Sequence, residues 1–328
     1  MAQTTSEVWD SAWSSTRRSV RPEVIDNIFE EYAALAMHRK QGMQMTDNGG
    51  KEIQVILESA ANTAEAFDGY DQLSKNPSDP FESAFYKRRY YAVPIVLSDT
   101  ENWENGGSAK VFDLLNALGN NSQQSLAKAV NEDLLGAQTG KTMLGYQDIM
   151  ADATGATVGG INSTTSTFWE SQRDTTATTF LSQTTTNVFD GIDLWNDIMD
   201  TCQIQGGLSK GAIVTTHSIA RAYRIAVSSQ GYAETSLANA SGVGGKMLPS
   251  FYHLPVVADN DVSADHSYFV DTNAVKLNVL RQANFRKTPF QSMIVNGQFA
   301  QIAYVYVSVQ LTTNNRRRSG VGTAITGA

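Results

Sequence analysis

Two segments, residues 51–59 and 88–97, alternate apolar and polar positions with a period of two. That period is typical of a half-buried β-strand. Between them, residues 62–80 are polar and rich in turn-forming residues. The pattern therefore predicts a long β-hairpin arm with a polar tip. The apolar face of the first strand carries Ile53, Val55 and Leu57, and that of the second strand starts with Tyr91 and Val93.

Such an arm does not supply a core of its own. An isolated two-stranded hairpin is only marginally stable in water. It needs a surface to lie on, and another copy of the chain can supply that surface where its own domain does not. The arm therefore favours a protein that assembles with other copies of itself over an enzyme.

Helices are predicted where apolar residues recur at spacings of three and four. Pro22 suits the first turn of one helix, and Gly206-Gly207 is typical of the end of another. The predicted helices span residues 22–40, 108–137, 190–205 and 218–228, and the second of these is the longest.

Further strands are predicted in the second half of the chain, and together with the helices they indicate an α+β fold. The strongest alternation lies in residues 299–314. Residues 152–187 are rich in Thr, Ser and Gly and are expected to form loops with short strands, and residues 229–250 are expected to form a loop. The other predicted strands span residues 211–216, 254–258, 267–271 and 275–280.

Composition narrows the class of protein. The chain has 328 residues, a net charge of −8, 41% hydrophobic residues and 18% charged residues. The apolar fraction is enough for a sizeable core, and the acidic balance argues against a dedicated nucleic-acid binder. The low charged fraction suits a surface that partners largely cover. A single cysteine, Cys202, forms no intrachain disulfide.

The chain shows no targeting or membrane signal. No apolar run approaches the length of about 20 residues that a membrane span needs. The first residues lack the basic start and apolar core of a secretory signal, so folding in a cytoplasm is expected.

Motifs for catalysis are weak. The sequence GAQTGKT at residues 136–142 misses the spacing of a phosphate-binding loop by one residue and follows a predicted helix instead of a strand. The four histidines are dispersed, and no GxSxG motif is present. No catalytic, metal-binding or cofactor-binding residue is therefore predicted. An α+β enzyme remains a less favoured alternative, and a tail-tube or baseplate protein is weaker still.

Two small groups of residues suit contacts between subunits. Trp9 and Trp13 lie four residues apart, so one helical face carries both indoles. They suit a protein groove better than a membrane interface, because little charge flanks them. Arg316, Arg317 and Arg318 form the only run of three arginines. Three arginines fall below the usual nucleic-acid patch of about 5–8 residues, so pairing with acidic neighbours at a subunit junction is favoured.

The order of the elements resembles the major capsid protein of tailed bacteriophages, which has the Hong Kong 97 fold. The order is a polar arm, a helix, an extended hairpin, a long helix, an αβ region and a return strand. Phrases that carry the resemblance are SAFYKRRYYAVPIVLSDTE, GGINSTTSTFWES, MLPSFYHLPVVADNDVSADHSYFVDTNAVKLNVL and FAQIAYVYVSVQLTTNNRRRSGV.

The resemblance implies a domain organisation for the chain. Residues 1–45 would be the N-terminal arm and its helix, and residues 46–98 the extended loop that lies across a neighbouring subunit. Residues 99–186 and 290–328 would form the peripheral domain with its spine helix, and residues 187–289 the axial domain. The residues expected at subunit contacts are Trp9, Trp13, Ile53, Val55, Leu57, Tyr91, Val93, Arg316, Arg317 and Arg318.

The implied function is a structural, non-enzymatic shell. The chain would assemble with itself into pentamers and hexamers of an icosahedral capsid around double-stranded DNA, which it contacts only weakly. It would be assembled in the host cytoplasm and reside in the virion. A scaffolding protein, a portal and possible decoration proteins are the expected partners, with no membrane and no cofactor. An encapsulin-like bacterial compartment shell is the alternative with the same fold.

Overall fold

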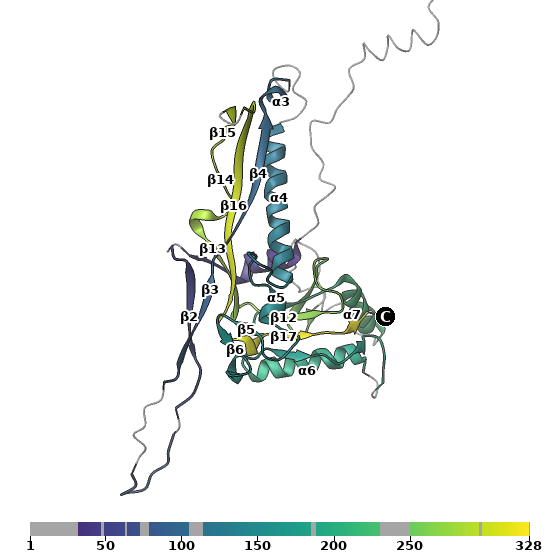
Figure 1. The fold of residues 1–328 in the computed structure, drawn as a ribbon. Helices are drawn as coiled ribbons and strands as arrows, with labels where there is room; N and C mark the ends of the chain where they lie inside the picture. The colour runs from purple at the N-terminus through teal and green to yellow at the C-terminus, as the bar shows by residue number, and fades with distance from the viewer. Residues whose placement is uncertain are drawn as a thin grey trace, which may run out of the picture.

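The structure is a computed structural model that describes residues 32–46, 49–62, 64–72, 79–104, 114–184, 188–229, 250–294 and 297–327. Trp9, Trp13, most of the predicted helix at residues 22–40 and most of the predicted loop at 229–250 lie outside the described residues. Figure 1 shows three parts. A long sheet is backed by a helix, a second sheet with two helices lies below the long sheet, and a hairpin projects away from both.

The long sheet is built around β16, Ala300–Thr313. On one side β16 pairs antiparallel with β4, Arg89–Ser98, in a register that runs from Ala300 opposite Ser98 to Val309 opposite Arg89. Shorter strands pair along the rest of β16, and β1 joins the sheet in parallel with β13. These strands are β1 Met43–Thr46, β13 Val275–Leu280, β14 Arg286–Lys287 and β15 Gln291–Ser292.

One face of the long sheet is buried under α4, Leu114–Leu135. The alternation of β16 directs a row of small and β-branched side chains to this face, and Ile95 of β4 joins them. Leu126, Val130 and Leu134 of α4, which recur at spacings of four, are buried in the same core cluster. The buried residues of β16 in this row are Ala303, Val305, Val307, Val309 and Leu311.

The second sheet has the order β10-β11-β9-β12-β17-β7. Helices α6, Asp190–Ile204, and α7, His217–Ser229, pack with it around Trp195. The Trp195 ring meets Phe180 and Phe251 edge-on, with centroids 5.1 and 5.4 Å away. The strands are β7 Gln172–Asp174, β9 Gly211–Thr215, β10 Ser250–Phe251, β11 Leu254–Ala258, β12 Ser267–Asp271 and β17 Gly320–Gly322.

Short elements connect these parts. A short helix, α2, leads through one wider helical turn, η1, into β1. The remaining short elements are α2 Ala33–Met37, η1 His38–Gly42, α3 Asp99–Glu104, α5 Tyr146–Ile149, β5 Thr157–Val158, β6 Ile161–Asn162, η3 Thr167–Trp169, β8 Thr178–Thr179, η6 Arg281–Ala283, η8 Arg316–Arg318 and β18 Ile325–Thr326.

Most predicted elements are confirmed. The predicted strands at 254–258, 267–271 and 275–280 are β11, β12 and β13, and the long helix continues unbroken from residue 114 to 135. The predicted α+β class is confirmed, and residues 152–187 hold short strands as expected.

The pairing predicted for the hairpin is wrong. Residues 51–59 do not pair with 88–97; β2, Glu52–Glu58, pairs with β3, Phe81–Lys87, and the next strand, β4, pairs with β16. The chain from residue 81 to 98 therefore forms two strands, β3 and β4, separated at Arg88. The alternating pattern of β4 belongs to the long sheet, because that sheet offers a partner strand, β16, and a helix, α4, that buries its apolar face.

Sheet membership also crosses the domain bounds expected from the resemblance. Strand β13 lies inside residues 187–289 but pairs with β16, while β7 and β17 lie outside that range and complete the second sheet. The expected bounds of the peripheral and axial domains stay a prediction.

Arg316 joins the end of the long strand to the rest of the body. Its side chain is 1% exposed. The guanidinium donates to the carbonyl oxygens of Ile149 at 2.7 Å, Trp169 at 3.0 Å and Asp148 at 3.2 Å. Burial lowers the pKa of Arg316 to about 10, so the guanidinium stays charged at neutral pH. It binds two separate turns of chain, α5 and η3, where β16 leaves the long sheet.

Replacing Arg316 should destabilise the monomer strongly. Arg316→Met keeps the length of the side chain but leaves three carbonyls, two of them in buried hydrogen bonds, without their donor, so the free energy of unfolding should fall by about 3–5 kcal/mol. Arg317→Met is the matched control, because Arg317 is partly exposed and should change stability by about 0.5 kcal/mol or less. Denaturant unfolding of both variants checks this, and equal losses would contradict the assigned role.

Candidate assembly surfaces

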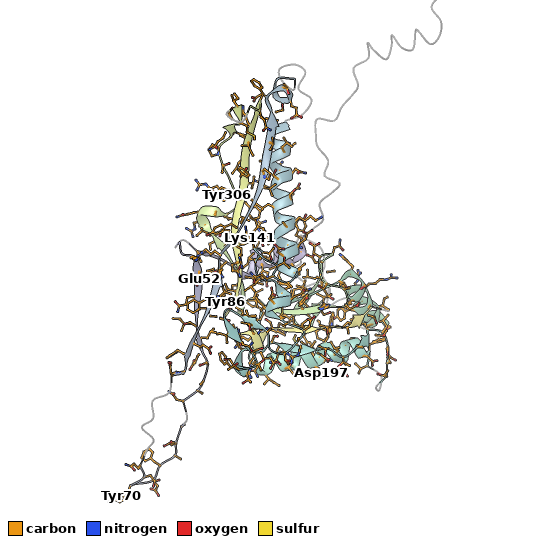
Figure 2. All side chains as sticks on the ribbon, viewed as in Figure 1. Glu52, Tyr70, Tyr86, Lys141, Asp197 and Tyr306 are labelled. Carbon is orange, nitrogen blue, oxygen red and sulfur yellow. The ribbon has the colours of Figure 1, made fainter. Side chains whose placement is uncertain are left out.

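The projecting hairpin rests on the body through its base. Leu57, Ala84 and Tyr86 turn inward and are buried in the main core. The Tyr86 hydroxyl donates to the carbonyl of Thr313 at 2.9 Å, at the end of β16. Figure 2 shows Tyr86 at this base and Tyr70 at the far end of the hairpin.

The turn between β5 and β6 contacts the base of the hairpin. The Phe85 amide donates to the carbonyl of Gly159 at 2.9 Å. Gly159 has a φ of +63°, and a Cβ there would lie 2.8 Å from the Cβ of Ala84. Only glycine combines this backbone conformation with so close an approach. The hairpin is therefore held at its base, while its distal part extends beyond the body.

The outward face of the hairpin carries apolar side chains that its own chain leaves open. Ile56 is 70% exposed, Phe81 is 64% exposed and Phe85 is 50% exposed. The register places Ile56 opposite Ser83, so Phe81 and Phe85 are its diagonal neighbours on the same face. Phe67 and Tyr70 continue the exposed aromatic character towards the tip.

A second open apolar face lies on the long sheet, on the side away from α4. Tyr90 of β4 is 68% exposed, and Val96 and Tyr304 are also exposed. In the antiparallel register Tyr304 faces Pro94 and Ile302 faces Val96, so these side chains share one face. We call this the outer sheet face. Large exposed apolar patches on soluble proteins mark interaction sites.

The structure places the residues expected at subunit contacts mostly inside their own chain. Leu57 and Arg316 are buried, and the side chains of Ile53, Val55, Tyr91 and Val93 pack partly against the main core. The Tyr91 hydroxyl donates to Asp133 of α4 at 2.6 Å. A contact with another subunit through these residues stays a prediction, as it does for Trp9 and Trp13.

Sequence reasoning missed the opposite faces of the same strands. It selected the more regular apolar rows, which are the rows that folding buries. The sequence does carry a signal for these exposed residues, because large apolar side chains occupy positions of the strands that alternate with the buried row. These residues are Ile56, Phe81, Phe85, Tyr90 and Val96.

The other two arginines of the run remain near the surface. Arg318 donates to the carbonyl of Gly206 at 2.6 Å, beyond the end of α6. Arg317 lines an open cavity of about 330 Å³ beneath the hairpin base, together with Glu58, Phe168 and Gln205.

A buried polar group fixes α2, the described end of the N-terminal segment. Asp259 accepts from the Ala34 amide at 3.1 Å, and Asn131 of α4 accepts from the Leu35 amide at 3.2 Å. The Asn131 amide in turn donates to Asp261 at 2.7 Å. These side chains satisfy backbone donors at the start of a helix.

His38 lies in the same region and has no access to solvent. Its Nε2 lies 2.7 Å from the Tyr146 hydroxyl. Burial lowers the pKa of His38 to about 4, so the imidazole is neutral at physiological pH. Gly42 packs against this ring so closely that a Cβ would lie 2.7 Å from Nδ1.

A metal-binding group and a membrane-spanning helix are both absent from the described residues. No group of three or more His, Cys, Asp or Glu side chains among them could hold a metal ion. None of the helices within the described ranges is long and apolar enough to cross a membrane.

No protein-family model and no curated protein sequence matches this chain. Solved structures do. The capsid asymmetric unit of cyanophage A-1(L) is similar with a TM-score of 0.71 at 14% identity, over 95% of this chain and 98% of that chain. The capsid of the native GTA particle is similar with a TM-score of 0.66 at 11% identity, over 99% and 100%. The chain has the Hong Kong 97 capsid fold.

This fold also occurs outside phages. The SrpI encapsulin complex from Synechococcus elongatus PCC 7942 is similar with a TM-score of 0.62 at 8% identity, over 100% of this chain and 98% of that chain. The capsid fold expected from the order of elements is therefore confirmed, and the projecting hairpin and long sheet are parts of it.

Acid should destabilise the folded monomer through His38. The folded state keeps His38 neutral down to pH about 4, whereas the unfolded chain binds a proton below its ordinary pKa of 6.5. The contribution is fully present above pH 6.5 and is lost as the pH falls towards 4. It amounts to about 3 kcal/mol.

Unfolding by denaturant across this pH range checks the expectation. The wild-type protein should lose about 3 kcal/mol more than His38→Gln between pH 6.5 and 4. Burial raises the pKa values of Asp148 and Asp271, which acts in the opposite direction in both proteins and so cancels in the difference. Parallel curves for the two proteins would contradict the assignment.

Proposed function

We propose that this chain is the major capsid protein of a tailed phage, which assembles with itself into the icosahedral shell around a double-stranded DNA genome. The observation that carries the proposal is the hairpin, which projects from the body and leaves Ile56, Phe81 and Phe85 exposed. The likeness over nearly the full chain to two capsid structures supports it.

The hairpin explains how such a shell would hold together. A neighbouring subunit that covers the exposed face would bury apolar area which a monomer leaves in water. A subunit that reaches several neighbours through hairpin, arm and domain edges gains avidity from geometry, even where each contact is weak. Head-to-tail contacts of this kind close into rings, which here would be the pentamers and hexamers.

The domain roles follow the same resemblance. Residues 1–45 would act as the N-terminal arm and residues 46–98 as the extended loop. Residues 99–186 with 290–328 would form the peripheral domain, and residues 187–289 the axial domain. The role is structural, without catalysis or a cofactor.

The partners beyond the chain itself are a scaffolding protein, a portal and possible decoration proteins. Packaged DNA would contact the wall weakly, which suits the net charge of −8. The protein would be assembled in the host cytoplasm and would remain in the virion.

A bacterial compartment shell is the second candidate, and the likeness to the SrpI encapsulin favours it. The two functions differ in what the shell encloses. A neighbouring gene for a portal or terminase supports the phage capsid, and a gene for a cargo enzyme supports the compartment.

Electron microscopy of the purified chain, together with light scattering, tests the shell itself. Closed particles tens of nanometres across are expected, with or without a co-expressed scaffolding protein. A chain that stays monomeric under both conditions would contradict the proposal.

Shortening the hairpin should separate folding from assembly. Glu58 faces Phe81 at the distal end of the ladder, so replacing residues 59–80 by Asn-Gly gives a two-residue turn that suits the register. The variant should unfold at the same denaturant concentration as the wild type and form no closed particles.

A matched pair of point variants sharpens this test. Ile56→Asp and Gln54→Asp place the same charge on the same exposed face of β2. Ile56→Asp should prevent assembly because it charges an apolar contact, whereas Gln54→Asp should leave it intact. Normal shells from the shortened hairpin and from Ile56→Asp would show that the hairpin does not join subunits.

A further inference from the structure

A hollow of about 100 Å³ lies at one border of the long sheet, beside α4. Strand β1 pairs with β13 so that Met45 stands opposite Val279, and Val279 stands opposite Val309 of β16. Directly paired residues share a face of a sheet, so Met45 lies on the face that α4 covers. Met45 is nevertheless 41% exposed, so this border of the covered face stays partly open. We call the hollow the edge pocket.

The edge pocket is apolar inside and basic at its rim. Leu35 of α2, Val130 of α4 and Val309 line it and are buried, and Phe285 lines it between η6 and β14. Figure 1 shows α2 and η1, in purple, next to the lower part of α4. Arg39 of η1 also lines the pocket and is exposed. Within the ranges that the structure describes, its guanidinium has no hydrogen-bond or ion-pair partner.

The size and lining of the pocket limit what it can hold. An engineered apolar cavity of about 150 Å³ binds benzene. The edge pocket is smaller, at about 100 Å³, but one side is open and two of its lining residues are Met43 and Met45. Methionine side chains adapt to irregular shapes. The pocket therefore suits part of one aromatic ring, and a carboxylate beside that ring would lie near Arg39.

The chain carries such a group upstream of the pocket. Residues 1–21 are mainly polar and contain two aromatic residues, Trp9 and Trp13, with Asp10 between them. A tryptophan buries about 150–250 Å² when it packs, and so polar a segment offers the two rings no core of its own. The Asp10 carboxylate is also the group that a free guanidinium binds best.

The tether favours the same chain over other occupants. Trp13 and Leu35 are 22 positions apart, a length that spans up to about 70 Å when extended, so reach does not prevent the contact. A group on a short tether has an effective concentration on the order of millimolar at a site within its reach. A second subunit or another protein at micromolar concentration competes poorly with it.

We propose that, in the unassembled subunit, the edge pocket takes an indole of Trp9 or Trp13 from the N-terminal segment of its own chain, with Asp10 beside Arg39. The contact holds the segment on its own body and covers apolar surface that the described residues leave open. It concerns the subunit before assembly and does not depend on the shell. The same segment of a second copy and a segment of another protein are the competing occupants.

Crosslinking between engineered cysteines of the full chain tests the contact. Native Cys202 is buried, and burial raises the pKa of its thiol to about 12, so it does not react. Ala12→Cys and Asn284→Cys place one thiol in the segment and one in the lining of the pocket. Each thiol adds across one double bond of a short bismaleimide, and a crosslink within one chain is expected.

A second cysteine pair is the matched control. It keeps Ala12→Cys and replaces Asn284→Cys by Lys210→Cys, an exposed position at the start of β9 in the second sheet. A tether alone would bring the segment to both positions, whereas docking favours the pocket. The control pair should therefore crosslink about tenfold more slowly.

Substitutions on both sides of the contact should abolish this preference. Trp9→Ala together with Trp13→Ala removes both rings and leaves every residue of the pocket intact. Met45→Asp places a charge in an apolar pocket, which must then lose water when a ring enters. Each should slow the crosslink about tenfold. Ile225→Asp is the control for Met45→Asp, because Ile225 of α7 is 42% exposed and lies outside the pocket.

A charge swap tests the rim. Arg39→Glu and Asp10→Arg should each slow the crosslink about threefold, as expected for one exposed ion pair, and the two together should restore the rate. Lys210→Glu reverses an exposed cation outside the pocket and should not rescue Asp10→Arg.

The outcomes separate this contact from the shell. Equal rates at Asn284→Cys and Lys210→Cys, or a rate that survives the loss of both indoles, would overturn the contact and leave the shell standing. Products that form only between two chains would assign the pocket to a second copy and overturn docking within one chain. Denaturant unfolding shows which variants fold, and the tryptophan variants decide the question even if Met45→Asp does not. Internal crosslinking without any closed particle would contradict the proposed shell and support this contact.

Discussion

The pairing of β16 with its neighbours is the interaction on which the rest of the structure depends. Fourteen residues, Ala300–Thr313, hold β4 along one edge and β13, β14 and β15 along the other. The inward row of β16 packs against α4, and Arg316 just beyond the strand binds three carbonyls in two turns of the body. Without this strand, the sheet, the long helix and the hairpin base would have no common support.

The same geometry explains why the molecule exposes apolar side chains. A strand sends alternate side chains to opposite faces, and a single helix covers only one face of a sheet. The outer sheet face and the outward face of the hairpin therefore remain open within one chain, although Ile56, Phe85, Tyr90 and Tyr304 stand on them. A monomer that leaves such surfaces in water gains stability when other copies cover them.

Polar groups divide their roles by burial. Arg316, Asn131, Asp259 and His38 are buried and hydrogen-bonded within the chain, where they fix the directions in which segments leave the body. The exposed cations of the last 57 residues and the exposed carboxylates of the hairpin instead lie at the surface. Buried polar groups thus help to determine the shape of the folded chain.

The sequence by itself determined the α+β fold class and most of the elements, because local periodicity is a property of neighbouring residues. The strands at 254–258, 267–271 and 275–280 and the helices α4, α6 and α7 were predictable in this way. Tertiary structure alone decided the pairing of β2 with β3 and of β4 with β16, since strand partners are chosen by contacts between distant segments. It also decided that Arg316 is internal and that Ile56 and Tyr90 are exposed, because alternation marks two faces of a strand without saying which one the fold will cover.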